Sequence, residues 1–141
     1  EIGEYIRQAG FEFGVTTGRA RRTGWFDAVM ARYAVRVNGL TSIVINKIDP
    51  LRGLDKIKLC VAYEKDGKIV NDFPADLDEL AKCTPVYEEF DGFDEDISGV
   101  RNYADFPQSI KTYIEAVEKA CGCPVSIIGV GPDREQIVYK D

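Results

Sequence analysis

One stretch of the sequence places a helical pattern directly before a short run of β-branched residues, and this order constrains the fold more than any other feature. Apolar residues recur at helical spacing from Phe26 to Val37, and Asn38 and Gly39 end the pattern. Leu40 to Ile45 is then rich in apolar and β-branched residues, which is typical of a buried strand in a parallel sheet. A helix followed by such a strand favours the α/β class of folds.

Similar patterns extend this interpretation over the rest of the chain. The other expected elements are a helix over Ile2 to Ala9, strands over Ile57 to Tyr63 and Lys68 to Val70 with an Asp66-Gly67 hairpin turn, a strand over Pro85 to Phe90, a helix from Pro107 to Cys121, and strands over Pro124 to Ile128 and Ile137 to Tyr139. We therefore expect a mostly parallel sheet with a β-hairpin excursion. The first helix has no capping residue before it, which is the pattern of a chain entered part-way through a helix.

The composition excludes several classes of protein. The 141 residues carry 18 basic and 24 acidic side chains, with a net charge of -6 and a pI near 4.8, which argues against a nucleic-acid binder. No apolar run approaches the roughly 18 residues of a membrane span, so we expect a cytoplasmic protein. The absence of histidine removes the commonest general base and zinc ligand. The four cysteines lack metal or redox spacing and are expected to be reduced and structural.

Acidic and basic side chains are separated along the chain. Glu64 to Asp105 holds 13 acidic and four basic residues, whereas Thr16 to Arg36 holds five arginines and a single acid, Asp27. The acidic segment is expected to form a solvated surface. Its carboxylates also offer one explanation for the arginines, because ion pairs between surface residues are common.

Asn46-Lys47-Ile48-Asp49 follows the apolar strand, at the position where open α/β sheets bind ligands. Guanine presents two adjacent donors, its ring N–H and its exocyclic amino group, and one carboxylate accepts both. Adenine presents an acceptor there, so Asp49 would favour guanine because the wrong base leaves polar groups unpaired. The stem of Lys47 can lie along the base, and Asn46 can tie neighbouring loops together. The alternative is a strand that stops at a polar turn before Pro50.

Thr16-Thr17-Gly18-Arg19-Ala20-Arg21-Arg22 is a glycine-hinged basic loop that precedes a helix. Its hydroxyls, backbone N–H groups and arginine forks suit carboxylate or phosphate oxygens, and the following helix would add the positive end of its dipole. The sequence therefore predicts an anion-binding loop here. Pairing of its arginines with the acidic segment is the alternative.

Gly129-Val130-Gly131-Pro132 follows the strand over Pro124 to Ile128. Its two glycines would let the flat face of a ligand approach the backbone closely, although a tight turn explains them equally well. The chain has no GxxxxGK phosphate loop and no carboxylate pair placed for proton transfer. These motifs together indicate half of a nucleotide site.

The blocks VTTGRARRTGWFDAV, NKID, LDKIKLCVAYEKDG and GVGPDR, in this order and spacing, resemble the carboxyl-terminal part of the adenylosuccinate synthetase family. The resemblance runs through nearly all 141 residues, and TTGRARRTGWFD is its most specific block. It implies the carboxyl-terminal fragment, residues 1–141, of a single larger α/β domain with a P-loop-NTPase-like sheet. It also implies a GTP-dependent carbon–nitrogen ligase of purine biosynthesis that joins IMP and L-aspartate into adenylosuccinate and uses Mg²⁺. In that family GTP phosphorylates the 6-oxygen of IMP, and the aspartate amino group then displaces the phosphate.

The resemblance further implies roles for particular residues. The residues that match the family's aspartate-binding loop are Val15, Thr16, Thr17, Gly18, Arg19, Ala20 and Arg21. Arg19 matches the arginine that also reaches IMP, and Arg21 matches the one that contacts GTP as well as aspartate. The residues that match the two guanine-nucleotide stretches are Lys47, Ile48, Asp49, Gly129, Val130 and Gly131.

Two positions depart from the family pattern. Position 129 is commonly serine, so Gly129 leaves only backbone contact with the base. Position 46 is often threonine, and Asn46 brings the chain nearer to the regulatory GTPases. The family's phosphate loop, catalytic aspartate and catalytic histidine lie in its amino-terminal part. We therefore expect no catalytic or metal-binding residue here, Mg²⁺ bound by that other part, and a fragment that is inactive alone.

The complete enzyme is expected to be a homodimer that binds GTP, IMP and L-aspartate, with no nucleic-acid or membrane partner. Two other functions fit parts of the sequence. Asn46 to Asp49 would also suit a stand-alone guanine-nucleotide-binding module without ligase activity. Arg19, Arg21 and Arg22 would suit an RNA-contacting domain, whose affinity would fall steeply with salt.

Overall fold

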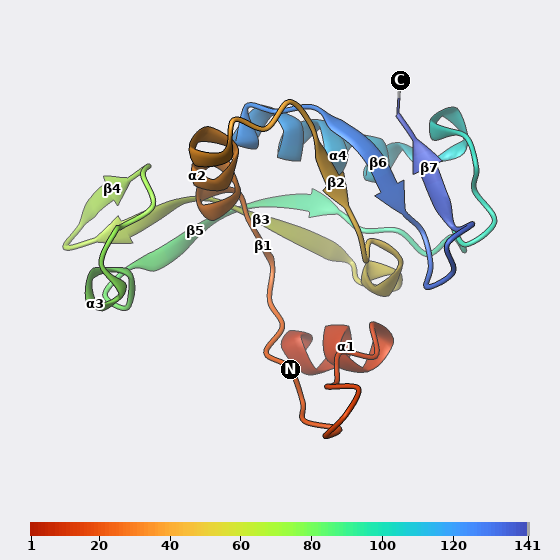
Figure 1. Ribbon diagram of the computed structural model, residues 1–141, viewed down its shortest axis with the longest axis horizontal. Helices are drawn as coiled ribbons and strands as arrows, with labels where there is room; N and C mark the ends of the chain where they lie inside the picture. The colour runs from red at the N-terminus through yellow and green to blue at the C-terminus, as the bar shows by residue number, and fades with distance from the viewer. Residues whose placement is uncertain (141) are drawn as a thin grey trace.

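Strand β3 (Lys56–Lys65) organises the first of two sheets in the computed structural model, which describes residues 1–140 (Figure 1). The short strand β1 (Phe26–Asp27) runs parallel to β3, while β4 (Lys68–Val70) and β5 (Thr84–Asp91) pair with it in the antiparallel direction. The β3–β4 turn has positive φ angles of 52° at Asp66 and 71° at Gly67, as the predicted hairpin requires.

The second sheet places β6 (Val125–Gly129) between a parallel and an antiparallel neighbour. Strand β2 (Ile43–Ile45) is parallel to β6, and β7 (Ile137–Tyr139) is antiparallel to it. The expectation of a mostly parallel sheet is therefore wrong for the described residues, in which both sheets are mixed. The reason is that β4 and β7 follow their partners after short connections, and a short connection reverses the chain because a parallel return needs a longer crossover.

The three long helices lie where the sequence predicts them, with shifts of a few residues at their ends. The helical segments are α1 (Ile2–Ala9), α2 (Ala28–Asn38), α3 (Leu77–Leu80) and α4 (Gln108–Cys121), with single 3-10 turns η1 (Asp49–Leu51) and η2 (Tyr103–Asp105). Gly39 and Gly122 end α2 and α4 with φ angles of 61° and 66°, which glycine adopts without strain. Within residues 1–140, no helix is both long enough and apolar enough to cross a membrane.

Helix α2 begins two residues later than its apolar pattern predicts. Phe26 and Asp27 form β1 instead, and the Asp27 carboxylate accepts hydrogen bonds from the backbone N–H groups of Val29 at 2.9 Å and Met30 at 3.1 Å. This is an N-cap, which satisfies amides that the first helical turn leaves unpaired. The predicted apolar face is only partly buried, since Met30 and Val37 are exposed.

The main core lies between α4 and the two sheets. Helix α4 buries one face, whose residues are Ile110, Tyr113, Ile114, Val117 and Cys121. These pack with residues of β2, β3 and β6 in one cluster. Burial raises the pKa of the Cys60 and Cys121 thiols to about 11, so both behave as packing groups rather than nucleophiles.

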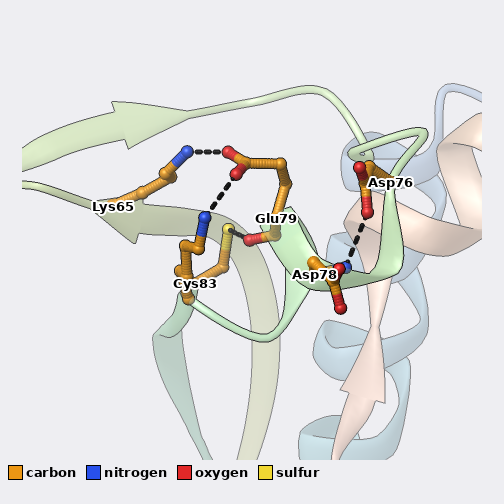
Figure 2. A network of polar contacts seen from close by, with 6 residues as sticks. Lys65, Asp76, Asp78, Glu79 and Cys83 are labelled. Carbon is orange, nitrogen blue, oxygen red and sulfur yellow. Dashed lines mark hydrogen bonds and ion pairs between the residues drawn. The ribbon is translucent and has the colours of Figure 1, made fainter.

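Around the short helix α3, the acidic segment is organised by contacts between its own residues (Figure 2). Asp76 caps the short helix α3 by accepting a hydrogen bond from the backbone N–H of Asp78 at 2.8 Å. Glu79 receives the ammonium groups of both Lys65 and Lys82, the latter at 2.6 Å, and its carbonyl lies 3.4 Å from the Cys83 thiol. The acids in this region thus hold local structure at an exposed end of the molecule.

Candidate functional site

The sheet of β2 and β6 brings the two predicted guanine-binding segments together. Ile45 lies opposite Ile128 in parallel register, so the residues that follow both strands leave the sheet at the same edge. Gly129 is buried, and a Cβ atom at this position would lie 2.7 Å from Oδ1 of Asn46. The two positions that depart from the family pattern are therefore in contact, and the missing side chain at Gly129 makes room for Asn46.

Gly131 also avoids a collision, but with a different partner. A Cβ atom there would collide with Oε1 of Gln136, whose backbone carbonyl accepts a hydrogen bond from the N–H of Val130 at 2.9 Å. The space beside Gly131 is thus used by the turn itself in this structure. Gly131 is therefore required by the packing of Gln136, in addition to its predicted contact with a ligand.

Lys47 points its side chain at the segment that follows α1. Its ammonium donates to the carbonyl of Gly10 at 2.5 Å and pairs with the Glu12 carboxylate at 3.3 Å. The φ angle of Lys47 is 63°, a conformation that costs energy in a residue other than glycine. The neighbouring Ile48 is only 1% exposed, so the core fixes the backbone here, while the exposed Lys47 side chain is oriented by its two polar contacts.

Asp49 begins the 3-10 turn η1 and is half-buried. Burial raises the pKa of its carboxyl above the ordinary value, against smaller opposing effects of its own backbone N–H and of Lys47. Among residues 1–140, no lysine or arginine forms an ion pair with Asp49. A ligand that offers N–H donors would therefore compensate its partial burial.

The basic loop is a small exposed hairpin. Its two limbs are joined by backbone hydrogen bonds from Gly14 to the carbonyl of Arg19 at 2.8 Å and from Arg21 to the carbonyl of Glu12 at 2.9 Å. Gly18 has a φ angle of 65°, the left-handed conformation that its hinge position requires. Val15 at the tip is 98% exposed.

The arginines of this loop do not pair with the acidic segment. Arg21 binds Glu12, with its guanidinium nitrogen 3.1 Å from the carboxylate, and within the described part of the chain Arg19 and Arg22 form no ion pair. That alternative explanation of the three cations is therefore wrong. The first amides of α2, whose dipole was expected to assist the loop, are already capped by Asp27.

A cavity of about 340 Å³ joins the loop to the sheet edge. Its lining residues are Ile6, Glu12, Arg21, Arg22, Thr23, Gly24, Trp25, Phe26, Ile45, Asn46, Lys47, Ile48, Leu51 and Tyr113. It thus unites Arg21 with Lys47 and Ile48, while Val15 to Ala20, Asp49 and Gly129 to Gly131 lie outside its lining. A larger cavity, of about 590 Å³, shares no lining residue with it and lies between α4 and the β3–β5 pair.

Glu12 is the charged residue in the lining of this cavity that the sequence motifs did not reveal. Burial raises the pKa of its carboxyl, but hydrogen bonds and charges of Lys47 and Arg21 outweigh that effect and hold the pKa below its usual value. A single acid between a helix and a basic loop was the available signal. The local sequence GFEFG does not indicate that Glu12 pairs with Arg21 and the distant Lys47.

The cavity offers cations and flat apolar surface to a ligand, and its one carboxylate, Glu12, pairs with two of the cations. Arg21 and Arg22 present guanidinium forks to carboxylate or phosphate oxygens, and Lys47 adds a third cation at the sheet edge. Trp25 and Phe26 supply flat apolar surface on the same cavity. The cavity therefore fits a ligand with one planar and one anionic part.

Comparisons with known proteins find the same family over almost the whole chain. The model of the family described as adenylosuccinate synthetase matches residues 1–138. The adenylosuccinate synthetases of Clostridium perfringens and Acetivibrio thermocellus are 53% and 54% identical over 138 residues, which cover 98% of this chain and 32% of each relative. The solved structure of fully ligated adenylosuccinate synthetase from Plasmodium falciparum has a TM-score of 0.94 and 38% identity, covering 99% of this chain and 34% of that one. The chain thus spans about a third of the length of the relatives it matches.

Proposed function

The chain belongs to the adenylosuccinate synthetase family, and from that premise we propose that it forms the guanine-binding and aspartate-binding portion of a GTP-dependent ligase. The ligase would join IMP and L-aspartate into adenylosuccinate. The observation that carries this proposal is the single cavity in which Arg21 of the basic loop and Lys47 of the sheet edge share one carboxylate, Glu12.

Each half of the site would bind one kind of chemical group. Asp49 would accept the two adjacent N–H donors of guanine, and the stem of Lys47 would cover the base. Arg19 and Arg21 would bind anionic groups, Arg19 those of aspartate and IMP and Arg21 those of aspartate and GTP. Arg19 is exposed and forms no ion pair among the described residues, so a ligand would not have to displace a partner from it.

The chemical step would need groups from the rest of the protein. The cavity contains one carboxylate and no histidine, and that carboxylate is bound by two cations. Within residues 1–140 no three carboxylate or thiol side chains converge where a metal ion could bind. We therefore propose that Mg²⁺, the triphosphate and the proton-transferring residues are held outside this chain, and that the chain is inactive alone.

Asp49→Asn in the full-length protein tests the assignment of the guanine site. The amide donates to the carbonyl that xanthine carries in place of the guanine amino group, so preference should move from GTP toward XTP by about tenfold or more. The steady-state kcat/KM with each nucleotide measures it. Asp55→Asn is the matched control, because Asp55 is an exposed acid that forms no ion pair in the described part of the chain. Unchanged use of GTP by Asp49→Asn would falsify the role of Asp49.

Assays on residues 1–141 and on the full-length protein distinguish the ligase from the other two functions. A stand-alone guanine-nucleotide module predicts tight GDP binding by residues 1–141 without the rest of the protein. An RNA-contacting domain predicts RNA affinity that falls steeply between low and high salt. The ligase requires turnover of IMP, aspartate and GTP by the full-length protein, and homodimerisation and a cytoplasmic location stay predictions.

A further inference from the structure

One carboxylate lies between two cations that come from different parts of the chain. Glu12 Oε2 is 3.1 Å from a guanidinium nitrogen of Arg21, and its Oε1 is 3.3 Å from the ammonium of Lys47. Arg21 lies in the basic loop, whereas Lys47 follows strand β2. Glu12 is therefore a direct side-chain bridge between the two halves of the proposed site.

The backbone holds Glu12 firmly in this position. Its N–H donates to the carbonyl of Arg7 at 2.9 Å, and its own carbonyl accepts from the N–H of Arg21 at 2.9 Å. The guanidinium of Arg7 in turn donates to the carbonyl of Arg21 at 2.7 Å. The Glu12 side chain is only 21% exposed, so its carboxylate is a fixed acceptor to which the two cations orient.

The two cations are far less constrained than the carboxylate. The side chains of Arg21 and Lys47 are 57% and 54% exposed, and ion pairs at such exposure contribute little stability. Either cation can therefore exchange Glu12 for a ligand oxygen at little cost in free energy. Lys47 keeps a second contact at the carbonyl of Gly10, so it stays oriented while Arg21 moves.

The charges that line the cavity favour the binding of an additional anion. Its lining carries the cations Arg21, Arg22 and Lys47 against the single carboxylate of Glu12. A carboxylate or phosphate that binds Arg21 replaces Glu12 as its partner, and the whole charge of Glu12 is then available to Lys47. Lys47 is then held more strongly in the orientation it already has at the edge where the base would bind, so occupancy of the loop favours occupancy of the base site.

We propose that Glu12 is a positioning residue that couples the two halves of the site, so that an anionic substrate on Arg21 strengthens binding of the guanine nucleotide beside Lys47. This inference rests on the proposed function, because it takes its two ligands from there. It goes beyond that function by assigning the coupling to a residue that binds neither ligand directly.

The test compares the full-length protein with its Glu12→Gln variant. In the wild type, the KM for GTP should fall by about fivefold or more between low and saturating aspartate. In Glu12→Gln this dependence should vanish, the KM for GTP and for aspartate should each rise by about tenfold, and kcat should stay within about twofold, because binding alone is weakened. A merely structural role would change the melting temperature and the active fraction, without removing the dependence on aspartate.

Two further variants make the result specific. Glu4→Gln is the control, since Glu4 is a carboxylate on the neighbouring helix α1 that pairs with Arg7 outside the cavity, and its KM values should match the wild type. Glu12→Asp keeps the charge on a shorter stem, so it should restore part of the coupling. If Glu12→Gln does not fold, Glu12→Gly and Glu12→Asp are compared instead. The proposal is overturned if Glu12→Gly keeps the full dependence of the KM for GTP on aspartate while Glu12→Asp loses it. It is also overturned if any folded variant without the carboxylate keeps the wild-type dependence.

The failure of this inference differs from the failure of the proposed function. A full-length wild-type protein that does not turn over IMP, aspartate and GTP refutes the function and this coupling together. An active wild type whose KM for GTP shows the same dependence on aspartate as that of Glu12→Gln refutes the coupling alone.

Discussion

The sheet edge at Asn46 to Asp49 and the basic loop with its tip, residues 15–22, belong to one proposed site but are held in different ways. Ile48 of the sheet edge belongs to the main core. The loop is held by hydrogen bonds between its own limbs and by Arg21, and its tip extends into solvent. In Figure 1, α1 and the loop lie apart from the sheets and join them through the extended segment before β1. The base half is therefore fixed by packing in the core, whereas the anion half is exposed and held by few contacts, as is typical of loops that bind ligands.

Replacing one apolar residue in each region should give the largest contrast. Ile48→Ala leaves a cavity in the core and should lower the free energy of unfolding by about 3 kcal/mol. Val15→Ala removes only exposed surface, so its effect should stay within about 0.5 kcal/mol. Urea unfolding of the full-length protein measures both, and similar losses in the two variants would contradict the contrast.

Arg19→Leu should weaken function without weakening the fold. A lost charged hydrogen bond is worth about 2 kcal/mol, so the KM for aspartate or IMP should rise roughly 30-fold while the unfolding curve stays unchanged. Arg134→Leu removes another exposed arginine, whose nearest carboxylate is 3.8 Å away, and should have no effect on either KM. Steady-state kinetics with each substrate in turn give the result, and a lowered melting temperature in Arg19→Leu would show that the loop is structural.

Gly129→Ser tests how tightly the sheet edge is packed. The new Cβ would meet Oδ1 of Asn46 at 2.7 Å, so the variant should lose about 1 to 2 kcal/mol of stability. The double variant with Asn46→Thr, which has a shorter side chain, should recover most of the loss. Thermal unfolding of the two single variants and the double variant measures this interaction, and additive effects would argue against the contact.

The pH dependence of stability should have opposite signs at the two regions, and it is the smallest expected effect. The Glu12 pKa is lowered by folding, so its contribution is present above the ordinary glutamate pKa and is lost as the pH falls through the folded value. The Asp49 pKa is raised, so its contribution is present below the ordinary aspartate pKa and is lost as the pH rises through the folded value. Unfolding curves of Glu12→Gln and Asp49→Asn against pH should therefore diverge from the wild type in opposite directions, and parallel curves would contradict both assignments.

Local sequence predicted most elements because their signals are local. The end of helix α4 at Cys121 and the turn at Asp66-Gly67 are each specified by neighbouring residues alone. Both lie where the sequence predicts them. The α2 boundary was wrong because Phe26 continues the helical spacing but pairs with Leu59, a residue far along the chain. The short helix α3 was missed because it has no apolar repeat long enough to show a period.

The sequence by itself determined the family, the basic loop and the segment that follows β2, because these depend on residue types at fixed spacing. The tertiary structure alone decided that Asn46 fills the space left by Gly129 and that Glu12 joins Arg21 to Lys47. Glu12 and Lys47 are separated by the basic loop, the strands β1 and β2 and the helix α2. Their distance is set by how the chain packs around α4 and the sheets, and no local pattern of residues encodes such a contact.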